Sequence, residues 1–252
     1  MIEILYGRQA VLEALRAGRR HARRVLLAEG VQERGIILEI IDAARQRRIP
    51  VQMVRRSELD RLGPVHHQGV VLETSSYPYA DLAEILKISQ ERDEPPFLLM
   101  LDHLQDPQNL GTLLRTAEAV GIHGVIIPKR RAVGITPAVC NTSAGAVEHL
   151  RVAQVANLSQ TISQLQQDGI WVVGLERTEG ALPLEEADLT GPLALVVGSE
   201  GRGVSRLVRE RCDWLVMLPM CGRITSLNAA VAGSIVLYAA WRARERTAAT
   251  SE

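Results

Sequence analysis

The sequence predicts an α/β protein, in which a mostly parallel sheet carries helices on both faces and follows a smaller α/β domain. From residue 97 onward, short apolar runs alternate with longer helical patterns, as in strands joined by crossover helices. A separate alternation of shorter segments occupies the first 75 residues. A charged stretch that ends in Pro95-Pro96 lies between the two regions and indicates a break.

The first 75 residues are predicted to fold as a unit of their own. Ala10, Val11, Ala14 and Leu15 lie on one face of a helix that would span residues 7–17. Further elements are predicted from apolar runs and capping patterns: strands at 24–28, 50–54 and 69–74, and helices at 33–48 and at 57–62, the latter capped by Ser57. We assign residues 1–75 to this domain and residues 76–95 to a linker that contains a helix near 80–90.

Residues 96–252 are predicted to form the larger domain. Its expected strands lie at 97–102, 124–128, 151–155, 171–176, 192–198 and 214–218. Its expected helices lie at 109–120, 137–147, 157–168, 203–212 and 226–244. The last helix is apolar almost all round, which indicates that it is buried or forms an interface.

The composition is that of a globular protein. A chain of 252 residues with 46% apolar residues can bury a full core. No uncharged apolar stretch reaches eighteen residues, and the first residues lack the pattern of a signal peptide, so we expect no membrane span. Cys140, Cys212 and Cys221 lack the spacing of a zinc site, which predicts reduced thiols in the cytoplasm and no metal.

The net charge is zero, but basic residues are concentrated near the N-terminus. The first 62 residues carry 13 arginines and no lysine against eight acidic residues. The excess is carried mainly by Arg16, Arg19, Arg20, Arg23, Arg24, Arg45, Arg47, Arg48, Arg55 and Arg56. Arginine suits bidentate contact with phosphate, which favours a nucleic-acid partner. A merely solvated arginine-rich face is the alternative, and charge alone does not decide between the two.

Three loop-to-helix junctions in the larger domain carry glycines and small polar residues. They span residues 109–115, 198–203 and 218–228. At such junctions an α/β enzyme exposes backbone donors and acceptors to a ligand. Together the three junctions predict a functional site.

The polar residues of these junctions also have purely structural interpretations. Asn109 and Ser226 are good N-caps for the helices that follow them, and Glu200 could cap the helix after its turn. Arg115 could pair with Glu118 on the same helix. The alternative is that Arg115 projects into a cleft toward a phosphate.

Other stretches are weaker candidates. His66-His67 could contact RNA or form a polar turn, and the small residues at 142–146 predict a tightly packed helix start near the site. We interpret His103 and Asp106, which flank the first junction, as loop residues.

In combination, the three junctions resemble the motifs of the SpoU family of RNA ribose 2′-O-methyltransferases, within the SPOUT superfamily. The motifs are Asn109-x-Gly111-x3-Arg115, Gly198-Ser-Glu200-Gly, and Leu218-Pro-Met220 through Ser226-Leu-Asn228. They occur in the family's order, and the resemblance extends over nearly the whole chain. Residues 6–15 and 67–69 resemble the small RNA-binding domain of the branch that acts on a 23S rRNA guanosine.

The resemblance implies a fold, a cofactor and an assembly. The larger domain should end in a C-terminal trefoil knot, a feature otherwise almost absent from proteins. The family binds S-adenosylmethionine within that knot and works as a homodimer, for which helix 226–244 offers a dimer face. The chemistry needs no metal.

The resemblance also implies roles for individual residues. The implied catalytic residues are Arg115, Asn109, Glu200, Ser226 and Asn228. The implied cofactor-binding positions are Gly198, Gly203, Leu218, Met220 and Leu227. Arg115 would steer a phosphate or stabilise charge on the ribose oxygen, which we favour over a role as the base because a guanidinium stays protonated.

The implied function is S-adenosylmethionine-dependent 2′-O-methylation of an RNA ribose, most specifically in a guanosine of 23S rRNA. One alternative keeps this chemistry but places it on tRNA or on an rRNA position that confers antibiotic resistance. A second alternative, from another class, is a non-catalytic RNA-binding factor in ribosome assembly.

Overall fold

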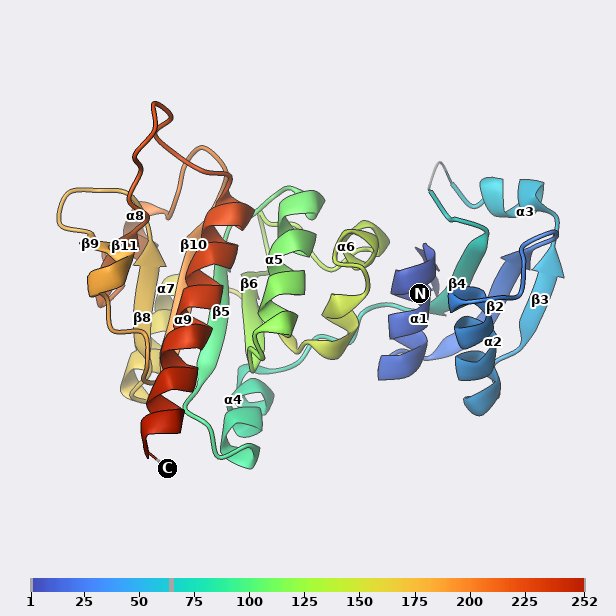
Figure 1. Ribbon diagram of the computed structural model, residues 1–252, viewed down its shortest axis with the longest axis horizontal. Coiled ribbons are helices and arrows are strands. Elements are labelled where there is room, and N and C mark those ends of the chain that lie inside the picture. The colour runs from blue at the N-terminus through green and yellow to red at the C-terminus, as the bar shows by residue number, and fades with distance from the viewer. Residues whose placement is uncertain (1, 64–65, 252) are drawn as a thin grey trace. The chain divides into compact units, whose positions relative to one another are not determined.

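Seven parallel strands form the main sheet, in the order β7-β6-β5-β10-β8-β11-β9 (Figure 1). The structure is a computed structural model that describes residues 2–63 and 66–251, with side chains as far as residue 247. The strands are β5 (Phe97–Asp102), β6 (Gly124–Pro128), β7 (Val152–Val155), β8 (Trp171–Leu175), β9 (Leu182–Pro183), β10 (Leu193–Gly198) and β11 (Trp214–Met217). The six predicted strands are confirmed to within one residue at each end, whereas β9 was not predicted.

Helices cover both faces of this sheet, as predicted. They are α4 (Leu82–Glu91), α5 (Pro107–Ala119), α7 (Leu158–Gln167), α8 (Arg206–Arg209) and α9 (Ala229–Ser251). On one face α5 and α9 lie side by side (Figure 1), and Gly233 of α9 is in close contact with Leu113 of α5 and Val197 of β10. On the other face Val196 joins a core built from α4, α7 and α8. Neighbouring residues of β10 therefore face opposite helical layers, as the alternation of side chains along a strand requires.

A second, four-stranded sheet lies in the N-terminal part, in the order β1-β4-β2-β3. Its elements are β1 (Ile2–Tyr6), α1 (Arg8–Ala17), β2 (Ala22–Ala28), α2 (Ile36–Gln46), β3 (Val51–Val54), α3 (Arg56–Asp60) and β4 (Val70–Ser75). β4 runs antiparallel to both β1 and β2, and β2 is parallel to β3. The sequence prediction missed β1, although Ile2, Ile4 and Tyr6 show the period of two that marks a strand.

The chain divides into two compact units that are not continuous in sequence. One unit consists of Met1–Pro78 and Ile135–His149, and the other of Tyr79–Gly134 and Leu150–Glu252. The inserted segment contains α6 (Pro137–Thr142) and the 3-10 helix η1 (Ala146–His149), which pack on α1 and β1. The predicted helix 137–147 is thus two short elements, because Ala144 and Gly145 both take a left-handed backbone conformation.

The small residues at 142–146 were predicted to start a helix, and this part of the prediction is wrong. They end α6, and Gly145 has a positive φ of 83°. A side chain at Gly145 would meet Glu13 of α1, so the glycine permits close packing within the N-terminal unit.

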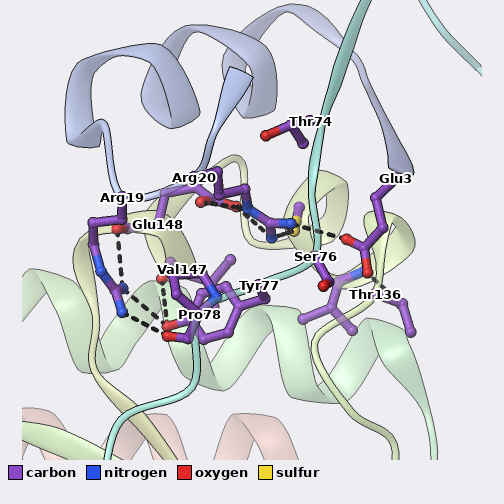
Figure 2. Close-up of polar contacts among 12 residues, drawn as sticks. Glu3, Arg19, Arg20, Thr74, Ser76, Tyr77, Pro78, Thr136, Val147 and Glu148 are labelled. Atoms are coloured by element: carbon purple, nitrogen blue, oxygen red, sulfur yellow. Dashed lines mark hydrogen bonds and ion pairs between the residues drawn. The ribbon is translucent and has the colours of Figure 1, made fainter. Parts of the chain in front are cut away.

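A buried polar cluster joins the inserted segment to the rest of this unit. Figure 2 shows the Arg20 guanidinium between two carboxylates: Nε lies 3.0 and 2.9 Å from the Glu148 oxygens, and Nη1 lies 2.9 Å from Glu3. The Arg20 and Glu148 side chains are each only 1% exposed. Tyr77, over which Arg20 also lies, donates to the Val147 carbonyl, and burial raises the pKa of its hydroxyl to about 12. Arg20, which belongs to the basic excess near the N-terminus, is therefore a structural residue.

Helix boundaries differ from the predictions where capping decides them. The predicted helix 203–212 is shortened to α8, and the predicted helix 226–244 begins three residues later as α9. α3 begins at Arg56, with Arg55 rather than Ser57 at its N-cap, and the Glu58 carboxylate accepts from the Arg55 amide. Among the described residues, no helix is long and apolar enough to cross a membrane.

Candidate active site

The candidate site lies at the carboxyl ends of three adjacent strands of the main sheet. β10 lies between β5 and β8, and Gly198 at its end is in register with Asp102 of β5. Glu176 follows β8 on the other side. Ligands of open parallel sheets bind at this edge, because the loops that leave the strands there form a crevice.

A cavity of about 470 Å³ opens at this edge. Its wall is built by the ends of β8, β10 and β11, the loop of residues 198–203 and the segment that leads into α9. The predicted site residues in this wall are Gly198, Glu200, Gly203, Leu218, Met220, Ser226, Leu227 and Asn228. Two of the three junctions thus line one cavity.

A chain of side-chain hydrogen bonds brings in the third junction. The Asn109 amide nitrogen donates to Glu200 Oε1 at 2.6 Å, and the Asn228 amide nitrogen donates to Asn109 Oδ1 at 2.9 Å. Asn228 Oδ1 in turn accepts from the amides of Ala230 and Val231. Glu200 is therefore oriented by residues from two helices that the sequence places far apart.

These contacts correct the predicted caps. Asp106, interpreted as a loop residue, is the N-cap of α5, whereas Asn109 lies inside the helix and is only 8% exposed. Asn228, and not Ser226, supplies the side-chain cap of α9, while Ser226 stays exposed in the cavity wall. Glu200 lies before the N-cap of α8, which is Ser205.

The loop that carries Glu200 is closed at its base. Ser199 and Gly203 exchange two backbone hydrogen bonds of 3.0 Å each. A Cβ at Gly198 would lie 2.1 Å from the Gly203 carbonyl carbon, so only glycine permits this approach of backbone to backbone. The second junction is thus a tight loop whose tip projects Glu200 into the cavity wall.

Three residues of the site were not predicted. Asp102 Oδ2 accepts from the Ser205 amide at 2.6 Å, and Glu176 Oε2 accepts from the Val204 amide at 2.7 Å. Arg177 donates to the Thr225 carbonyl at 2.7 Å and lines the cavity. Their position directly at the end of predicted strands was the available signal, but it requires the order of strands in the sheet.

Arg115 lies apart from this cavity. It is exposed, it does not line the cavity, and it is six residues beyond Asn109, or about 9 Å along α5. Within the described part of the chain it makes no hydrogen bond or ion pair, so the expected pair with Glu118 is not formed. A side chain on this face of α5 is free to contact a second molecule.

His67, a weaker candidate for RNA contact, has a structural role. His67 is buried, its Nε2 pairs with Asp60, and its Nδ1 accepts from the Gly69 amide, so it forms the polar turn and not an exposed RNA contact. In the described residues, no group of three or more His, Cys, Asp or Glu side chains could hold a metal ion.

Comparison with known proteins agrees with this arrangement. Residues 96–238 match the SpoU rRNA methylase family, and residues 4–80 match the substrate-binding domain of RNA 2′-O ribose methyltransferases. A Bacillus subtilis protein, YacO, assigned to the TrmH family of tRNA/rRNA methyltransferases, is 44% identical over 96% of both chains.

Solved structures give the same result. The SpoU methyltransferase AviRb from Streptomyces viridochromogenes, in complex with AdoMet, superposes with a TM-score of 0.80 at 25% identity, over 97% of this chain and 91% of that one. A crystal structure of an RNA 2′-O ribose methyltransferase superposes with a TM-score of 0.76 at 25% identity. The match covers 97% of this chain and 89% of that one. The chain therefore belongs to the SpoU rRNA methylase family and is an RNA methyltransferase of the SpoU/TrmH type.

Proposed function

We propose that the protein transfers a methyl group from S-adenosylmethionine to a ribose 2′-oxygen of RNA, most specifically in a guanosine of 23S rRNA. The observation that carries the proposal is the hydrogen-bonded chain Asn228-Asn109-Glu200 at the wall of the cavity. It joins the three motifs of the family at one place. The match of residues 4–80 to an RNA substrate-binding domain supports the RNA substrate.

The residues present fit the cofactor. A cavity of about 470 Å³ is within the usual range for small-molecule sites. Gly198 and Gly203 lie in the cavity wall, and Leu218, Met220 and Leu227 supply apolar walls for an adenosine. When bound, S-adenosylmethionine supplies an electrophilic methyl group on a sulfonium. Its presence in the AviRb structure supports this assignment.

The chain's own residues have to orient a poor nucleophile and stabilise its developing negative charge. Arg115, which stays protonated, is assigned to the phosphate next to the reacting ribose or to the 2′-oxygen itself. Glu200 is held by Asn109 at the cavity wall and would orient the nucleotide. Ser226 and Asn228 lie in the segment of the wall that leads into α9 and would position the substrate.

The position of Arg115 leads to the proposal of a homodimer. Val231, Ile235 and Tyr238 recur at the spacing of one face of α9 and are 46%, 42% and 55% exposed. Such an exposed apolar stripe marks an interaction surface. Because α5 packs beside α9, pairing of two copies through this stripe would bring Arg115 of one copy toward the cavity of the other.

The N-terminal unit would supply affinity for RNA. Arg48, Arg56 and Arg61 are exposed and form no ion pair within the described residues. Arg20 and Arg16, in contrast, are engaged by glutamates of this unit. Single-stranded loops of structured RNA expose a flexible ribose. The N-terminal unit favours rRNA, while tRNA remains the alternative substrate. We further propose a C-terminal trefoil knot in the larger unit and a location in the cytoplasm, where such RNA is processed.

One experiment tests the reaction and the substrate together. Ribose methylation is mapped across rRNA and tRNA from cells with and without the protein, and purified protein is incubated with labelled cofactor and RNA or the matching DNA. We expect one rRNA guanosine to lose its 2′-O-methyl group without the protein, and no label on DNA. Loss of a tRNA mark would favour the tRNA alternative. Absence of cofactor binding by calorimetry would favour a non-catalytic assembly factor.

A further inference from the structure

Two carboxylates flank the base of the glycine loop at the edge of the main sheet. Asp102 is the last residue of β5, and Glu176 directly follows β8. β10 lies between these two strands and leads into the loop at Gly198. The parallel register places Asp102, Gly198 and Glu176 in one row across the sheet. The carboxylates thus stand on either side of the strand from which the loop emerges.

Both carboxylates bind the segment that follows the loop, and neither binds the tip of the loop. Glu176 Oε2 accepts from the Val204 amide at 2.7 Å, and Asp102 Oδ2 accepts from the Ser205 amide at 2.6 Å. These are the two residues that directly follow Gly203, where the loop closes on Ser199. Two consecutive backbone donors are therefore fixed by two acceptors on different strands.

We propose that Asp102 and Glu176 are positioning residues that hold the loop of residues 198–205, so that Glu200 meets Asn109 and the cavity keeps the shape that the cofactor requires. This inference rests on the proposed methyltransferase function and deepens it. Gly203 contributes to the same anchoring, because a Cβ at this position would lie 2.2 Å from Glu176 Oε2 and would displace the carboxylate.

Charge makes these contacts effective. Hydrogen bonds from an amide to a carboxylate are stronger than those between neutral groups. Asp102 is 1% exposed, so water competes little for its oxygens. The tip of the loop, in contrast, has few contacts: Gly201 has a positive φ of 76°, and Arg202 is exposed. Without its two anchors, the loop would keep the closure between Ser199 and Gly203 and the link between Glu200 and Asn109, but it would lose both carboxylate bonds at its base.

The test compares Glu176→Ala with Glu176→Gln in the full-length protein. Alanine removes the acceptor, whereas the glutamine carbonyl can still accept from the Val204 amide. We expect hydrogen exchange of residues 199–205, measured without cofactor, to accelerate at least about tenfold in Glu176→Ala. Cofactor affinity in calorimetry should fall by about tenfold to a hundredfold. Glu176→Gln should lie clearly between wild type and Glu176→Ala in both measurements, because it keeps the hydrogen bond and loses only the charge.

Glu179→Ala is the matched control, since this exposed glutamate lies three residues away and outside the cavity wall. It should behave as wild type. If Glu176→Ala does not fold, Gly203→Ala tests the same contact with both carboxylates present and should release the same amides. Asp102→Asn, which also keeps an acceptor, should accelerate exchange of the Ser205 amide less than Asp102→Ala does.

Wild-type exchange in Glu176→Ala or, where that variant does not fold, in Gly203→Ala would overturn the proposal. So would equal loss of cofactor affinity in Glu176→Ala and Glu176→Gln, because it would assign Glu176 to direct contact with the cofactor. The exchange measurement needs neither RNA nor cofactor. If the wild-type protein methylates no RNA, the proposed function fails, while accelerated exchange in Glu176→Ala would still support the anchoring of the loop.

Discussion

The side-chain amide of Asn109 lies 2.6 Å from the Glu200 carboxylate, although 91 residues separate the two in sequence. Asn109 is nearly buried inside α5, and it also accepts from Asn228 at the start of α9. The Asn109 side chain thus donates to Glu200 of the second motif and accepts from Asn228 of the third.

Replacement of Asn109 by alanine should impair both stability and transfer. It leaves Glu200 and Asn228 without their partner, which should cost about 1–3 kcal/mol in the free energy of unfolding. We expect kcat/KM for RNA methylation to fall by roughly a hundredfold or more, as for loss of an orienting group. Urea unfolding and a labelled-methyl transfer assay measure the two effects.

Asn157→Ala is the control for this prediction. Asn157 caps α7 through the Gln160 amide and lies outside the cavity wall. Its loss should cost about 1 kcal/mol of stability without a change in transfer. Equal transfer by Asn109→Ala and Asn157→Ala would contradict the role of Asn109.

Arg115 should be needed for transfer but not for cofactor binding. Because it lies outside its own cavity, Arg115→Ala should abolish methylation while calorimetry gives an unchanged affinity for S-adenosylmethionine. If Arg115 of one copy acts in the cavity of the other, a second result is expected. Mixed dimers of Arg115→Ala with Glu200→Ala should recover activity, because one of their two sites would combine an intact Arg115 with an intact Glu200.

Two results would refute this arrangement. Inactive mixed dimers would place Arg115 and Glu200 in the same site of one chain. A monomeric wild-type protein in sedimentation would remove the dimer altogether. Ile235→Glu, which puts a charge in the exposed stripe of α9, should shift sedimentation toward the monomer and lower transfer with it.

Glu148→Ala should strongly destabilise the N-terminal unit. The Glu148 carboxylate is the buried partner of Arg20. Among the described residues, its removal leaves the buried guanidinium with only Glu3 as a counter-charge. The cost should be about 3–5 kcal/mol in urea unfolding. Glu39→Ala, which breaks the exposed pair with Arg16, should cost less than about 1 kcal/mol. Similar losses of unfolding free energy in both variants would show that the buried pair contributes no more to stability than the exposed one.

Stability should fall as pH decreases below about 6.5. Burial lowers the pKa of His123, and the hydrogen bond to Glu94 only partly opposes this, while Arg92 and Arg244 lower the pKa further. His123 Nδ1 accepts from the Phe97 amide at 3.0 Å, which requires the unprotonated ring. The unfolded chain therefore binds a proton before the folded one does, and stability is lost as pH falls from the ordinary histidine value toward the lowered one.

The free energy of unfolding at pH 7.5 and 5.5 measures this effect. Wild type should be less stable at pH 5.5, and His123→Gln should be less stable overall but lose this part of the pH dependence. Parallel pH profiles of wild type and variant would contradict the prediction.

The layers of the main sheet could be predicted because their signals are local. Apolar runs of strand length and helical stripes are properties of a few consecutive residues, and a sheet buried on both faces requires them. Helix ends were predicted less well. Asn109 and Ser226 have the chemistry of caps, but Asp106 and Asn228 occupy those positions, since tertiary contacts decide where the first turn begins.

The motif residues could be named from sequence. Eight of the ten line the cavity, and Asn109 is bonded to Glu200 in its wall, whereas Arg115 lies apart. The anchors Asp102 and Glu176 became visible only when β5, β10 and β8 were neighbours. Likewise Arg20 carries the same charge as the exposed arginines around it, and only folding places Glu148 against it. Periodicity is a property of residues that are close in sequence. A site and a buried ion pair depend on distances between segments far apart in sequence, and only the folded chain sets these distances.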